Sequence, residues 1–440
     1  MLIIGAGPVG LGMANALKAE GIAYDQVDAD DDVGGNWKHG VWDTAHIISS
    51  RKTTEFADFP MPADYPDFPS RANMLDYLNA YADHFDLRDA IAFNTKVVWV
   101  QPVADNRWQV TFESGEERVY KGVLACNGHH WQKRWPSYPG HFDGQMIHSK
   151  DFKHPDQLNG KRVLVIGGGN SACDVASEAA RVATRADLSI RRGYWFLPKV
   201  LFGIPLAEWI RPWMPVWSQR LLIRAALKVA VGDYRRYGLP RPDHRIFDHH
   251  PTISTEVLHY LKHGRIRPRP DIARFDGGRV TFTDGSSDAY DMIVAATGFH
   301  VSYPFLPAAL TPVDGPVVKV YGGSMLKDYR HLYLIGWGQP RYGFGPLVTP
   351  ASRLMARLIR LQDDIDYPLG QVMAAMGDKP PTTHLADPHK QIRQVRRAMK
   401  RLWLIKLVAR RLMRAPARPN APIDEPVPSF GHNAEPLVVY

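Results

Sequence analysis

Short apolar runs that lead into glycine turns are the clearest pattern in this chain. Residues 2–4 are apolar and precede the turn Gly5-Ala6-Gly7-Pro8-Val9-Gly10. Residues 11–18 then suit a helix, and residues 24–27 suit a second strand. A strand, a glycine turn, a helix and a second strand in this order predict a dinucleotide-binding unit rather than a chance glycine turn.

Four residues of this unit have expected roles. Gly5 permits the tight turn, Gly7 lets the backbone approach a pyrophosphate, and Gly10 allows close packing between helix and strand. The helix N-terminus offers unpaired N–H groups to the phosphates. Asp28, at the end of the second strand, is placed to accept hydrogen bonds from ribose hydroxyls.

The same pattern recurs from residue 161. The strand over residues 161–166 is followed by Gly167-Gly168-Gly169-Asn170-Ser171-Ala172, a helix over 173–181 and a strand over 186–190. This strand ends at Arg191 and Arg192, which can pair with a 2′-phosphate that a carboxylate would repel. The pattern predicts NADP(H) in this unit and FAD in the first. The alternative for the two arginines is a solvated pair at the end of a strand.

Three further apolar strands suggest how the chain divides into domains. They cover residues 123–126, 291–295 and 332–337. The second is followed by Ala296-Thr297-Gly298, where the chain is expected to cross between domains and Thr297 to contact a cofactor. We expect an α/β protein with two Rossmann-like dinucleotide-binding domains. The FAD domain would comprise residues 1–153 and 297–385, and the NADP domain residues 154–296, with a helical insertion at about 195–262.

The positive charge is concentrated near the C-terminus. The net charge is +9, but eleven of the 54 Lys and Arg residues lie between Lys390 and Arg418, and the other 43 nearly balance 45 acidic residues. The body of the protein therefore gives no sign of nucleic-acid binding. Residues 389–414 predict an amphipathic basic helix, which either contacts an anionic membrane surface or packs its apolar side on the body. Residues 386–440 thus form a separate tail that ends in a proline-rich stretch.

The composition excludes several classes. Cys126 and Cys173 form no CxxC pair, which excludes a flavin disulfide reductase, and a reducing, cytoplasmic location fits best. The pairs His129-His130 and His249-His250 lack a third ligand at a suitable spacing, so no metal is expected. The sequence has no apolar run of about 18 residues, so no transmembrane helix is expected. The oligomeric state is left open, a homo-oligomer included.

One eleven-residue stretch connects the two nucleotide turns. It reads Phe142-Asp143-Gly144-Gln145-Met146-Ile147-His148-Ser149-Lys150-Asp151-Phe152. Together with both glycine turns, Val33-Gly34-Gly35-Asn36-Trp37 and Ala296-Thr297-Gly298, it resembles the flavin-containing monooxygenases that use FAD and NADPH together. In that family the stretch ends in Phe or Tyr, as at Phe152. The related Baeyer–Villiger enzymes continue with Trp-Pro or Trp-Asp instead.

The resemblance implies a flavin C4a-hydroperoxide that transfers oxygen from O2 to a nucleophilic nitrogen or sulfur of a small organic substrate. Gly34 and Gly35 would bring backbone close to the flavin and Trp37 would cover it; the alternative is a plain turn with a core tryptophan. His148 is interpreted as a structural contact at the domain junction, in preference to an acid–base catalyst.

One position departs from the family. Many members carry an asparagine near the flavin in an Asn-x-x-Lys setting, and with Lys52 as the lysine, Ser49 takes the asparagine's place. A hydroxyl donates one hydrogen bond where the amide donates two. Arg51 could compensate, or could stabilise peroxide charge in a Baeyer–Villiger reaction. Baeyer–Villiger oxygenation and an NADPH oxidase or flavin reductase therefore remain alternatives.

Overall fold

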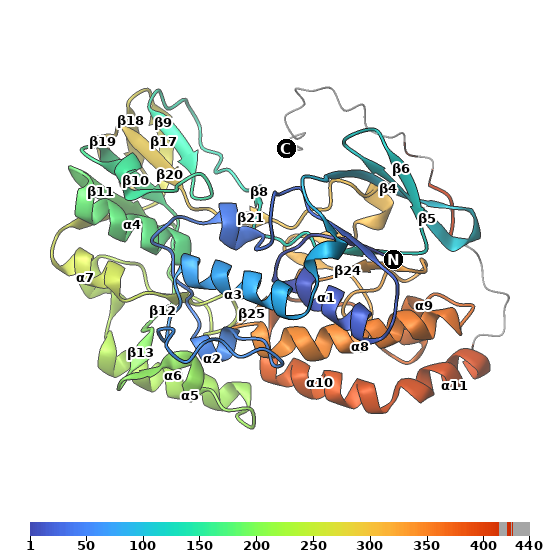
Figure 1. The fold of residues 1–440 in the computed structure, drawn as a ribbon. Helices are drawn as coiled ribbons and strands as arrows, with labels where there is room; N and C mark the ends of the chain where they lie inside the picture. Colours follow the sequence, from blue (N-terminus) through green and yellow to red (C-terminus); the bar gives the residue numbers. More distant parts are fainter. Residues whose placement is uncertain (413–419, 424, 426–440) are drawn as a thin grey trace.

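Two five-stranded parallel sheets organise the chain in this computed structural model, which describes residues 1–412, 420–423 and 425 (Figure 1). The first sheet has the strand order β24-β7-β1-β2-β3 and the second β16-β11-β10-β20-β9. Their strands are β1 (Leu2–Ile4), β2 (Asp25–Val27), β3 (Ile91–Ala92), β7 (Val123–Ala125) and β24 (Leu332–Leu334), and β9 (Gln145–His148), β10 (Arg162–Ile166), β11 (Arg185–Ser189), β16 (Ile266–Arg269) and β20 (Met292–Ala295). The predicted α/β fold with two Rossmann-like domains is confirmed.

The first sheet is covered on both faces, which explains why its central strand is wholly apolar. The helices α1 (Pro8–Ala19), α3 (Arg71–His84) and α8 (Gly345–Asp363) pack on this domain's core, and α1 lies directly against α8. Gly12 makes that contact possible, since a Cβ there would lie 2.4 Å from Val348 Cγ1. The other face carries the antiparallel strands β4 (Val97–Val103), β5 (Arg107–Phe112) and β6 (Glu117–Tyr120).

The second sheet repeats this layering. The helices α4 (Asn170–Val182) and α7 (Glu256–Lys262) pack on its core, and small residues such as Ala176 and Ala179 let α4 lie close to the strands. The antiparallel strands β17 (Ile272–Asp276), β18 (Arg279–Phe282) and β19 (Ser287–Ala289) cover its other face. Both domains therefore leave the carboxyl ends of their central strands free to form a site.

The two domains are joined by a short two-stranded ladder. The outgoing segment β8 (Gln132–Lys133) pairs antiparallel with the returning segment β21 (Phe299–His300). Strand β9 follows soon after β8 and pairs in parallel with β20, so it belongs to the second sheet. The structure thus places the start of the second domain before the expected residue 154, because the strand within the eleven-residue stretch completes that domain's sheet.

The expected helical insertion over about 195–262 is more varied than its sequence pattern indicated. Its one long helix is α6 (Val216–Ala230), and α7 belongs instead to the helical layer of the second domain, where it packs on α4. The remaining elements are short: β12 (Phe196–Leu197), β13 (Val200–Leu201), β14 (Ile204–Pro205), α5 (Leu206–Trp209) and β15 (Thr252–Ile253).

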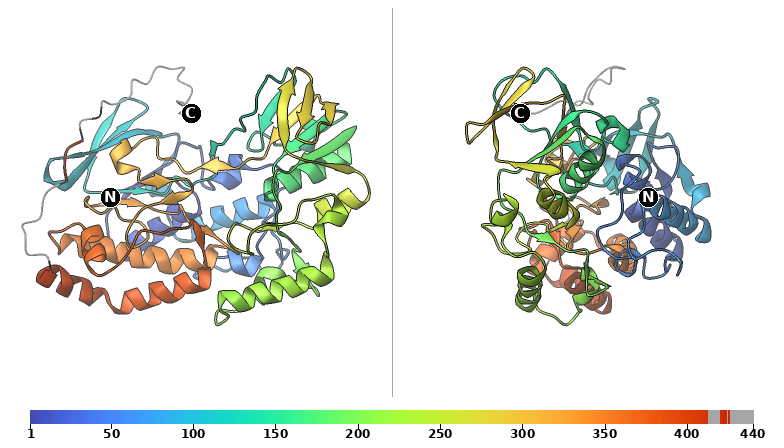
Figure 2. Two further views of the ribbon diagram at one scale, coloured as in Figure 1. Left: turned by 180° about the vertical axis from the view of Figure 1, so that it is seen from behind. Right: turned by 90° about the vertical axis from the view of Figure 1, so that its left-hand side faces the viewer.

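The C-terminal segment returns to the first domain. The predicted single helix over 389–414 is two helices, α10 (Pro388–Lys400) and α11 (Leu402–Leu412), and α10 packs on α8 while α11 packs on α9 (Leu369–Ala375). Figure 2 shows both helices along the edge that also carries α6. Two further strands, β25 (Gln339–Pro340) and β26 (Leu385–Ala386), pair in parallel, and β26 comes directly before α10 in the sequence. Most of the predicted proline-rich end lies outside the described residues.

Candidate active site

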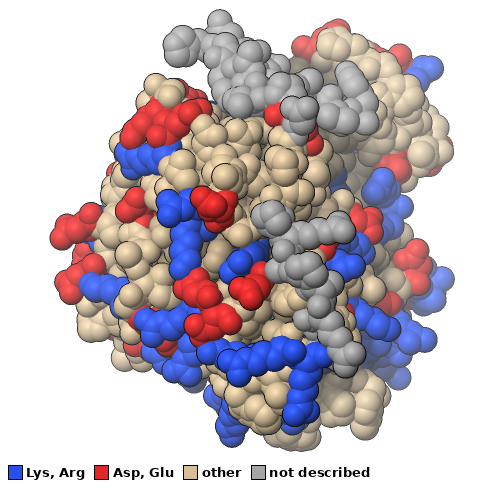
Figure 3. All heavy atoms as spheres, turned by 90° about the vertical axis from the view of Figure 1, so that its right-hand side faces the viewer, with Lys and Arg blue, Asp and Glu red and all other residues tan. Residues whose placement is uncertain are grey.

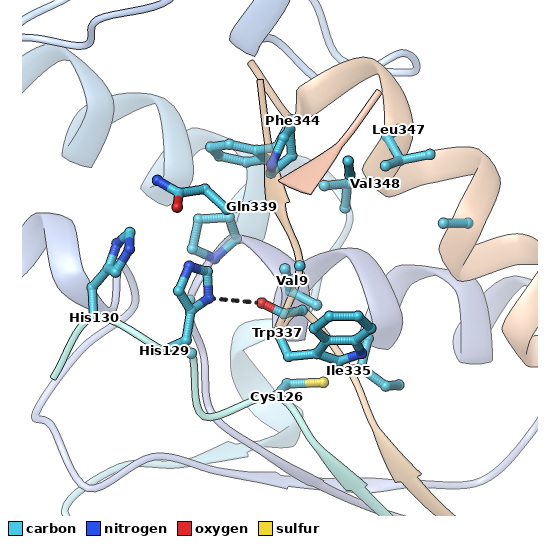
Figure 4. A pocket seen from close by; sticks show the side chains of 18 of the residues that line it. Val9, Cys126, His129, His130, Ile335, Trp337, Gln339, Phe344, Leu347 and Val348 are labelled. Carbon is cyan, nitrogen blue, oxygen red and sulfur yellow. Dashed lines mark hydrogen bonds between the residues drawn. The ribbon is translucent and has the colours of Figure 1, made fainter. Parts of the chain in front are cut away.

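A cavity of about 1810 Å³ opens where the two domains face each other. Ligand pockets for small molecules commonly measure about 300–1,000 Å³, so this one has room for more than one bound molecule. Its walls come from the first glycine turn, the first turn of α4, the loops 126–131 and 335–344, and the inner side of α10. Figure 4 shows the part lined by residues 126–130 and 335–348.

The three glycines of the first turn occupy different environments. Gly5 has φ +111° and a Cβ there would lie 2.6 Å from the carbonyl oxygen of Cys126. A Cβ on Gly10 would lie 2.0 Å from the carbonyl oxygen of Gly5. A Cβ on Gly7 would meet only the Cα of Gly35, at 3.6 Å, and Gly7 lines the cavity. The space beside Gly7 is therefore free for a ligand.

Gly7 is also the N-cap of α1, and no side chain caps that end of the helix. The unpaired N–H groups and the positive end of the helix dipole thus face the cavity. Asp28, which lines the same cavity, holds the turn: its Oδ2 accepts from Ala6 N at 2.5 Å and its Oδ1 from Asp30 N at 2.8 Å. Burial raises the pKa of the Asp28 carboxyl. This arrangement fits a pyrophosphate and an adjoining ribose.

The Gly34-Gly35 turn lies against the first glycine turn. Gly34 has φ +128° and Gly35 φ +54°, and a Cβ on Gly35 would come within 3.0 Å of the Cα of Gly7. Trp37 follows in a single π-helical turn (Asn36–Gly40), lines the cavity and also packs against the first core. Both interpretations of Trp37, as a cover for a ligand and as a core residue, thus describe part of its environment.

The second glycine turn is built in the same way. Gly167 has φ +133°, and a Cβ there would lie 2.4 Å from the carbonyl oxygen of Ala296, whereas a Cβ on Gly169 would meet nothing within 4 Å. Gly169 is the N-cap of α4 and no side chain caps it. Asn170 Oδ1 accepts from Ile253 N at 2.7 Å, and Asn170 and Ser171 line the cavity. The N-terminus of α4 thus also has a geometry that fits a pyrophosphate.

Arg191 and Arg192 do not line the cavity, and a third arginine, Arg134, lies near them. The Arg192 guanidinium lies over the Tyr194 ring, 5.3 Å from its centroid. Burial, and then the charges of Arg191 and Arg192, lower the pKa of Arg134. A group of three cations beside the N-terminus of α4 fits a phosphate monoester. The sequence pattern did not identify Arg134, because it comes from the other crossing segment.

The eleven-residue stretch contributes mainly to the junction, and within it Lys150 lines the cavity. His148 Nδ1 accepts from Lys150 N at 3.1 Å, so Nε2 carries the proton and donates to the carbonyl oxygen of Gly298, 3.0 Å away. Burial lowers the pKa of His148, which agrees with a neutral ring. The Thr297 hydroxyl donates to the carbonyl oxygen of Arg134, which ties the two crossing segments together.

The other members of that stretch are packing residues. A Cβ on Gly144 would lie 2.5 Å from the Phe142 ring and 2.9 Å from the carbonyl oxygen of Asp291. Phe142 is buried under the β17–β19 sheet. Phe152 is fully buried, with its ring centroid 5.9 Å from that of Trp42. None of Phe142, Gly144, His148 and Phe152 lines the cavity.

Ser49 and Arg51 separate in the structure. Ser49 lines the cavity, and its Oγ lies 2.7 Å from Oγ1 of Thr54, which also lines it. Arg51 begins α2 (Arg51–Thr54), and its Nη1 donates to the carbonyl oxygen of Pro62 at 2.8 Å. Arg51 does not line the cavity. The expectation that Arg51 compensates for the missing amide therefore needs correction, because the start of α2 turns its side chain away.

Two buried polar atoms of the loop 126–131 at the cavity lack partners. His129 Nδ1 donates to the carbonyl oxygen of Gly336 at 3.0 Å (Figure 4), so Nε2 is an acceptor, and within the described part of the chain nothing donates to it. Asn127 Nδ2 donates to the carbonyl oxygen of Ser302 at 3.0 Å, and its Oδ1 has no donor there either. Burial lowers the pKa of His129 and of His130. Such orphaned atoms fit a bound cofactor that supplies the missing donors.

A family model described as flavin-binding monooxygenase-like matches residues 1–360. The chain belongs to this family. Flavin-containing monooxygenase 5 of Homo sapiens is 30% identical over 416 residues, which cover 83% of this chain and 77% of the relative. Dimethylaniline monooxygenase (N-oxide-forming) 2 of Rattus norvegicus is 31% identical over 395 residues, 81% of this chain and 72% of the relative. The protein is thus an FAD-dependent monooxygenase that uses NADPH.

Solved structures share the fold. The open crystal structure of cyclohexanone monooxygenase has a TM-score of 0.71 at 18% identity and covers 91% of this chain and 98% of its own. A flavin-containing monooxygenase from Stenotrophomonas maltophilia has a TM-score of 0.63 at 24% identity, with 82% and 97% covered. The family's two-domain architecture therefore extends over most of this flavoenzyme.

Proposed function

We propose that this flavoenzyme transfers one oxygen atom of O2 to a nucleophilic nitrogen or sulfur of a small organic molecule. Support comes from the family, from the two uncapped helix N-termini that face one cavity, and from the hydroxyl pair on the wall of that cavity. FAD would lie along Gly7, Gly35 and Asp28. NADPH would lie along Gly169 and Ser171, with its 2′-phosphate at Arg191 and Arg192.

The bound flavin, reduced by NADPH, supplies the oxygen chemistry; the chain supplies position and exclusion of water. Asp28 would accept the ribose hydroxyls, and the backbone N–H groups of α1 and α4 would hold the two pyrophosphates. His148 and Thr297 hold the crossing segments together, which would fix the relative position of the two cofactor sites. Trp37 would shield the site from water.

The observation that carries the choice of reaction is the pair Ser49–Thr54. Each hydroxyl carries one proton, and one of these two protons forms the hydrogen bond between the Ser49 and Thr54 oxygens. The remaining O–H can donate into the cavity. Oxygen transfer to an amine or a sulfide needs a protonated oxidant, and a neutral O–H donor favours that form. The pair thus restores part of what an asparagine would supply.

Baeyer–Villiger oxygenation is the second candidate, since it needs a cation beside a deprotonated oxidant. Arg51 donates to Pro62 and is outside the cavity, so it does not supply one. Phe152 also ends the eleven-residue stretch as in the heteroatom-oxygenating members. Arg341 does line the cavity, however, and the test must therefore include a ketone and a variant of Arg341.

A rapid-mixing experiment tests the proposal. The holoenzyme is reduced with NADPH and mixed with O2, and absorbance is followed for a transient distinct from both reduced and oxidised flavin. A sulfide, an amine and a cyclic ketone are then compared for their effect on the decay of this transient. We expect the sulfide or the amine to accelerate the decay and to give a stoichiometric S- or N-oxide.

Variants of the hydroxyl pair sharpen the test. Ser49→Ala should shorten the lifetime of the transient and raise hydrogen peroxide release, and Ser49→Asn should lengthen it. Ser50→Ala is the matched control, because the neighbouring Ser50 hydroxyl contacts Thr53 and does not line the cavity. Immediate reoxidation with stoichiometric hydrogen peroxide in the wild type would establish an oxidase instead. If only the ketone gives an oxygenated product, and if Arg341→Met abolishes that product, the reaction is Baeyer–Villiger oxygenation.

We further propose that an anionic membrane surface is a partner of the C-terminal helices. Ile405 and Ala409 are buried on the body, which leaves the opposite side of the helices outward. Exposed basic residues of these helices that do not line the cavity are Arg393, Arg396, Arg397, Lys400, Arg401, Arg410 and Arg411. Figure 3 shows Lys and Arg side chains gathered toward the lower edge of its face. No helix among the described residues is long and apolar enough to cross a membrane.

A second observation supports this partner. The insertion exposes large apolar side chains, including Phe202 at 81%, Trp213 at 78% and Val229 at 83% exposure. His389 on α10 lies 3.2 Å from the carbonyl oxygen of Ile210, so the basic and apolar surfaces adjoin. Aromatic residues next to clustered cations suit an anionic lipid interface.

Vesicle co-sedimentation tests the partner. Deleting the tail is unsuitable because Val395 and Ala398 of α10 line the cavity. We therefore use the triple charge reversal of Arg396, Arg397 and Lys400 to Glu, with Arg279→Glu on the distant β18 as the control. At about 1 kcal/mol per basic residue, the triple variant should lose most of the affinity for phosphatidylserine vesicles. A wild type that stays in the supernatant at low salt would reject the idea.

A further inference from the structure

Arg341 holds a fixed position on the wall of the cavity. It follows β25, and its backbone N donates to the carbonyl oxygen of Ala386 at 3.0 Å, which extends the pairing of β25 with β26. Its side chain is only 13% exposed and lines the cavity. The backbone pairing thus presents this side chain to the cavity at a defined place.

The hydrogen-bonding capacity of Arg341 is largely unused. Among the described residues, Nε and Nη1 of the guanidinium have no hydrogen-bond partner, although both atoms are buried. In the described part of the chain, the carboxylate nearest to it is that of Asp387, whose Oδ2 lies 3.7 Å from Nη1, beyond hydrogen-bond distance. Its Oδ1 accepts from Lys390 N as the N-cap of α10. A buried guanidinium with unmet N–H groups is costly unless a ligand meets them.

The other neighbours are neutral. The guanidinium carbon lies 4.9 Å from the centroid of the Phe247 ring, a contact through the face that leaves the N–H edges free. Burial lowers the pKa of His250, another lining residue, to about 4, so it is uncharged at neutral pH. Burial also lowers the pKa of His384. Arg341 is therefore a cation among neutral rings, with Asp387 as its nearby carboxylate.

We propose that Arg341 is a specificity-determining residue that binds a carboxylate carried by the substrate. The inference rests on the proposed function, since it names the substrate class of the same cavity. Each arginine N–H can donate a charge-assisted hydrogen bond to a carboxylate, and the unpartnered Nε or Nη1 of Arg341 can supply one. The preferred substrates are thus anionic: sulfides or amines that carry a carboxylate at one end.

A pair of sulfides that differ only in charge tests this inference. The probes are 3-(methylthio)propanoate and 3-(methylthio)propan-1-ol, which present the same sulfur on the same chain. For the wild-type holoenzyme we expect kcat/KM for sulfoxidation to be about 10- to 100-fold higher for the acid, the range that a charge-assisted pair supplies. Arg341→Met should abolish this preference by raising KM for the acid, with the alcohol unaffected. Arg341→Lys should keep part of it.

Several results would overturn the inference. One is equal use of the two probes by the wild type; another is a preference that survives in Arg341→Met. If Arg341→Met raises KM for NADPH equally with both probes and leaves the preference intact, then Arg341 serves a cofactor phosphate and binds no substrate. Arg118→Met, an exposed arginine on β6, is the control. Bound flavin and melting temperature are measured for each variant, so that misfolding is recognised.

A binding measurement separates this inference from the proposed function. Butanoate and 1-butanol contain no sulfur and need no turnover, so calorimetry on the oxidised holoenzyme with NADP⁺ measures recognition alone. Tighter binding of butanoate that is lost in Arg341→Met supports the carboxylate site even if no probe is oxygenated. Equal binding of the two compounds contradicts it even if oxygenation proceeds.

Discussion

The same substitution at Gly7 and at Gly10 should have opposite consequences. A Cβ on Gly7 would lie 3.6 Å from the Cα of Gly35, an ordinary contact, and Gly7 has φ −76°, which alanine adopts readily. A Cβ on Gly10 would lie 2.0 Å from the carbonyl oxygen of Gly5, a backbone atom that moves only with the turn. The fold thus requires glycine at position 10, whereas only a ligand requires it at position 7.

The magnitudes follow from these contacts. Gly7→Ala should leave the FAD-free protein unchanged or more stable by about 0.4–1 kcal/mol, because alanine restricts the unfolded chain. The methyl group would hold a pyrophosphate away from the helix N–H groups. One lost charge-assisted hydrogen bond is worth about 1.5–3 kcal/mol, or about 10- to 150-fold weaker FAD binding. Gly10→Ala should destabilise the fold by about 1–3 kcal/mol through overpacking.

The assay measures stability and binding separately. Urea unfolding of the FAD-free proteins gives the free energy of unfolding, and quenching of FAD fluorescence gives the dissociation constant. Gly7→Ala should change only the second quantity, and Gly10→Ala should lower the first. A Gly7→Ala protein that loses about 2 kcal/mol of stability and still binds FAD like the wild type would refute the reasoning.

Three other perturbations test the fold and the site. Burial raises the pKa of Asp28, so ionisation of this carboxyl destabilises the FAD-free protein as pH rises through that pKa, whereas ribose binding needs the ionised form. On acidification from about pH 7 to about pH 4.5, FAD affinity should therefore fall and the stability of the FAD-free protein should rise. Titrations of both quantities across that range check this. Phe152→Ala should cost about 3–5 kcal/mol of unfolding free energy, with the exposed Phe202→Ala near zero in the same urea assay. Asp187 is fully buried between Arg185, Arg269 and Tyr290, so calorimetry of Asp187→Asn should show a loss of about 3–5 kcal/mol.

Local pattern was enough to predict the two nucleotide turns. A turn with a positive φ at Gly5 and again at Gly167 is set within a few residues, and the strand–helix order fixes where the turn faces. The sequence pattern placed the eleven-residue stretch at the domain junction, but it did not predict which sheet its strand joins. The pairing of Gln145–His148 with Met292–Ala295 in the structure places that strand in the second sheet.

Contacts between distant segments could not be predicted. Ser49 and Arg51 are two positions apart, but α2 begins at Arg51 and sends the two side chains in different directions. Thr54 reaches Ser49 across that same helix. Arg134 and Arg341 are unremarkable basic residues in the sequence; folding brings the first to the NADP turn and buries the second. Spacing along the chain carries no information about either event.

The charge of the C-terminal tail shows how composition alone can mislead about a site. The basic segment had two interpretations from its sequence: a helix on an anionic membrane surface, or a helix whose apolar side packs on the body. In the structure the same helices present Val395, Ala398 and Leu402 to the cavity. The tail is therefore a wall of the substrate site as well as a basic surface. Asp387 caps α10 and lies beside Arg341, so any partner that moves this helix would also alter the proposed carboxylate site. Membrane contact and substrate choice should therefore be coupled through the N-terminal end of α10.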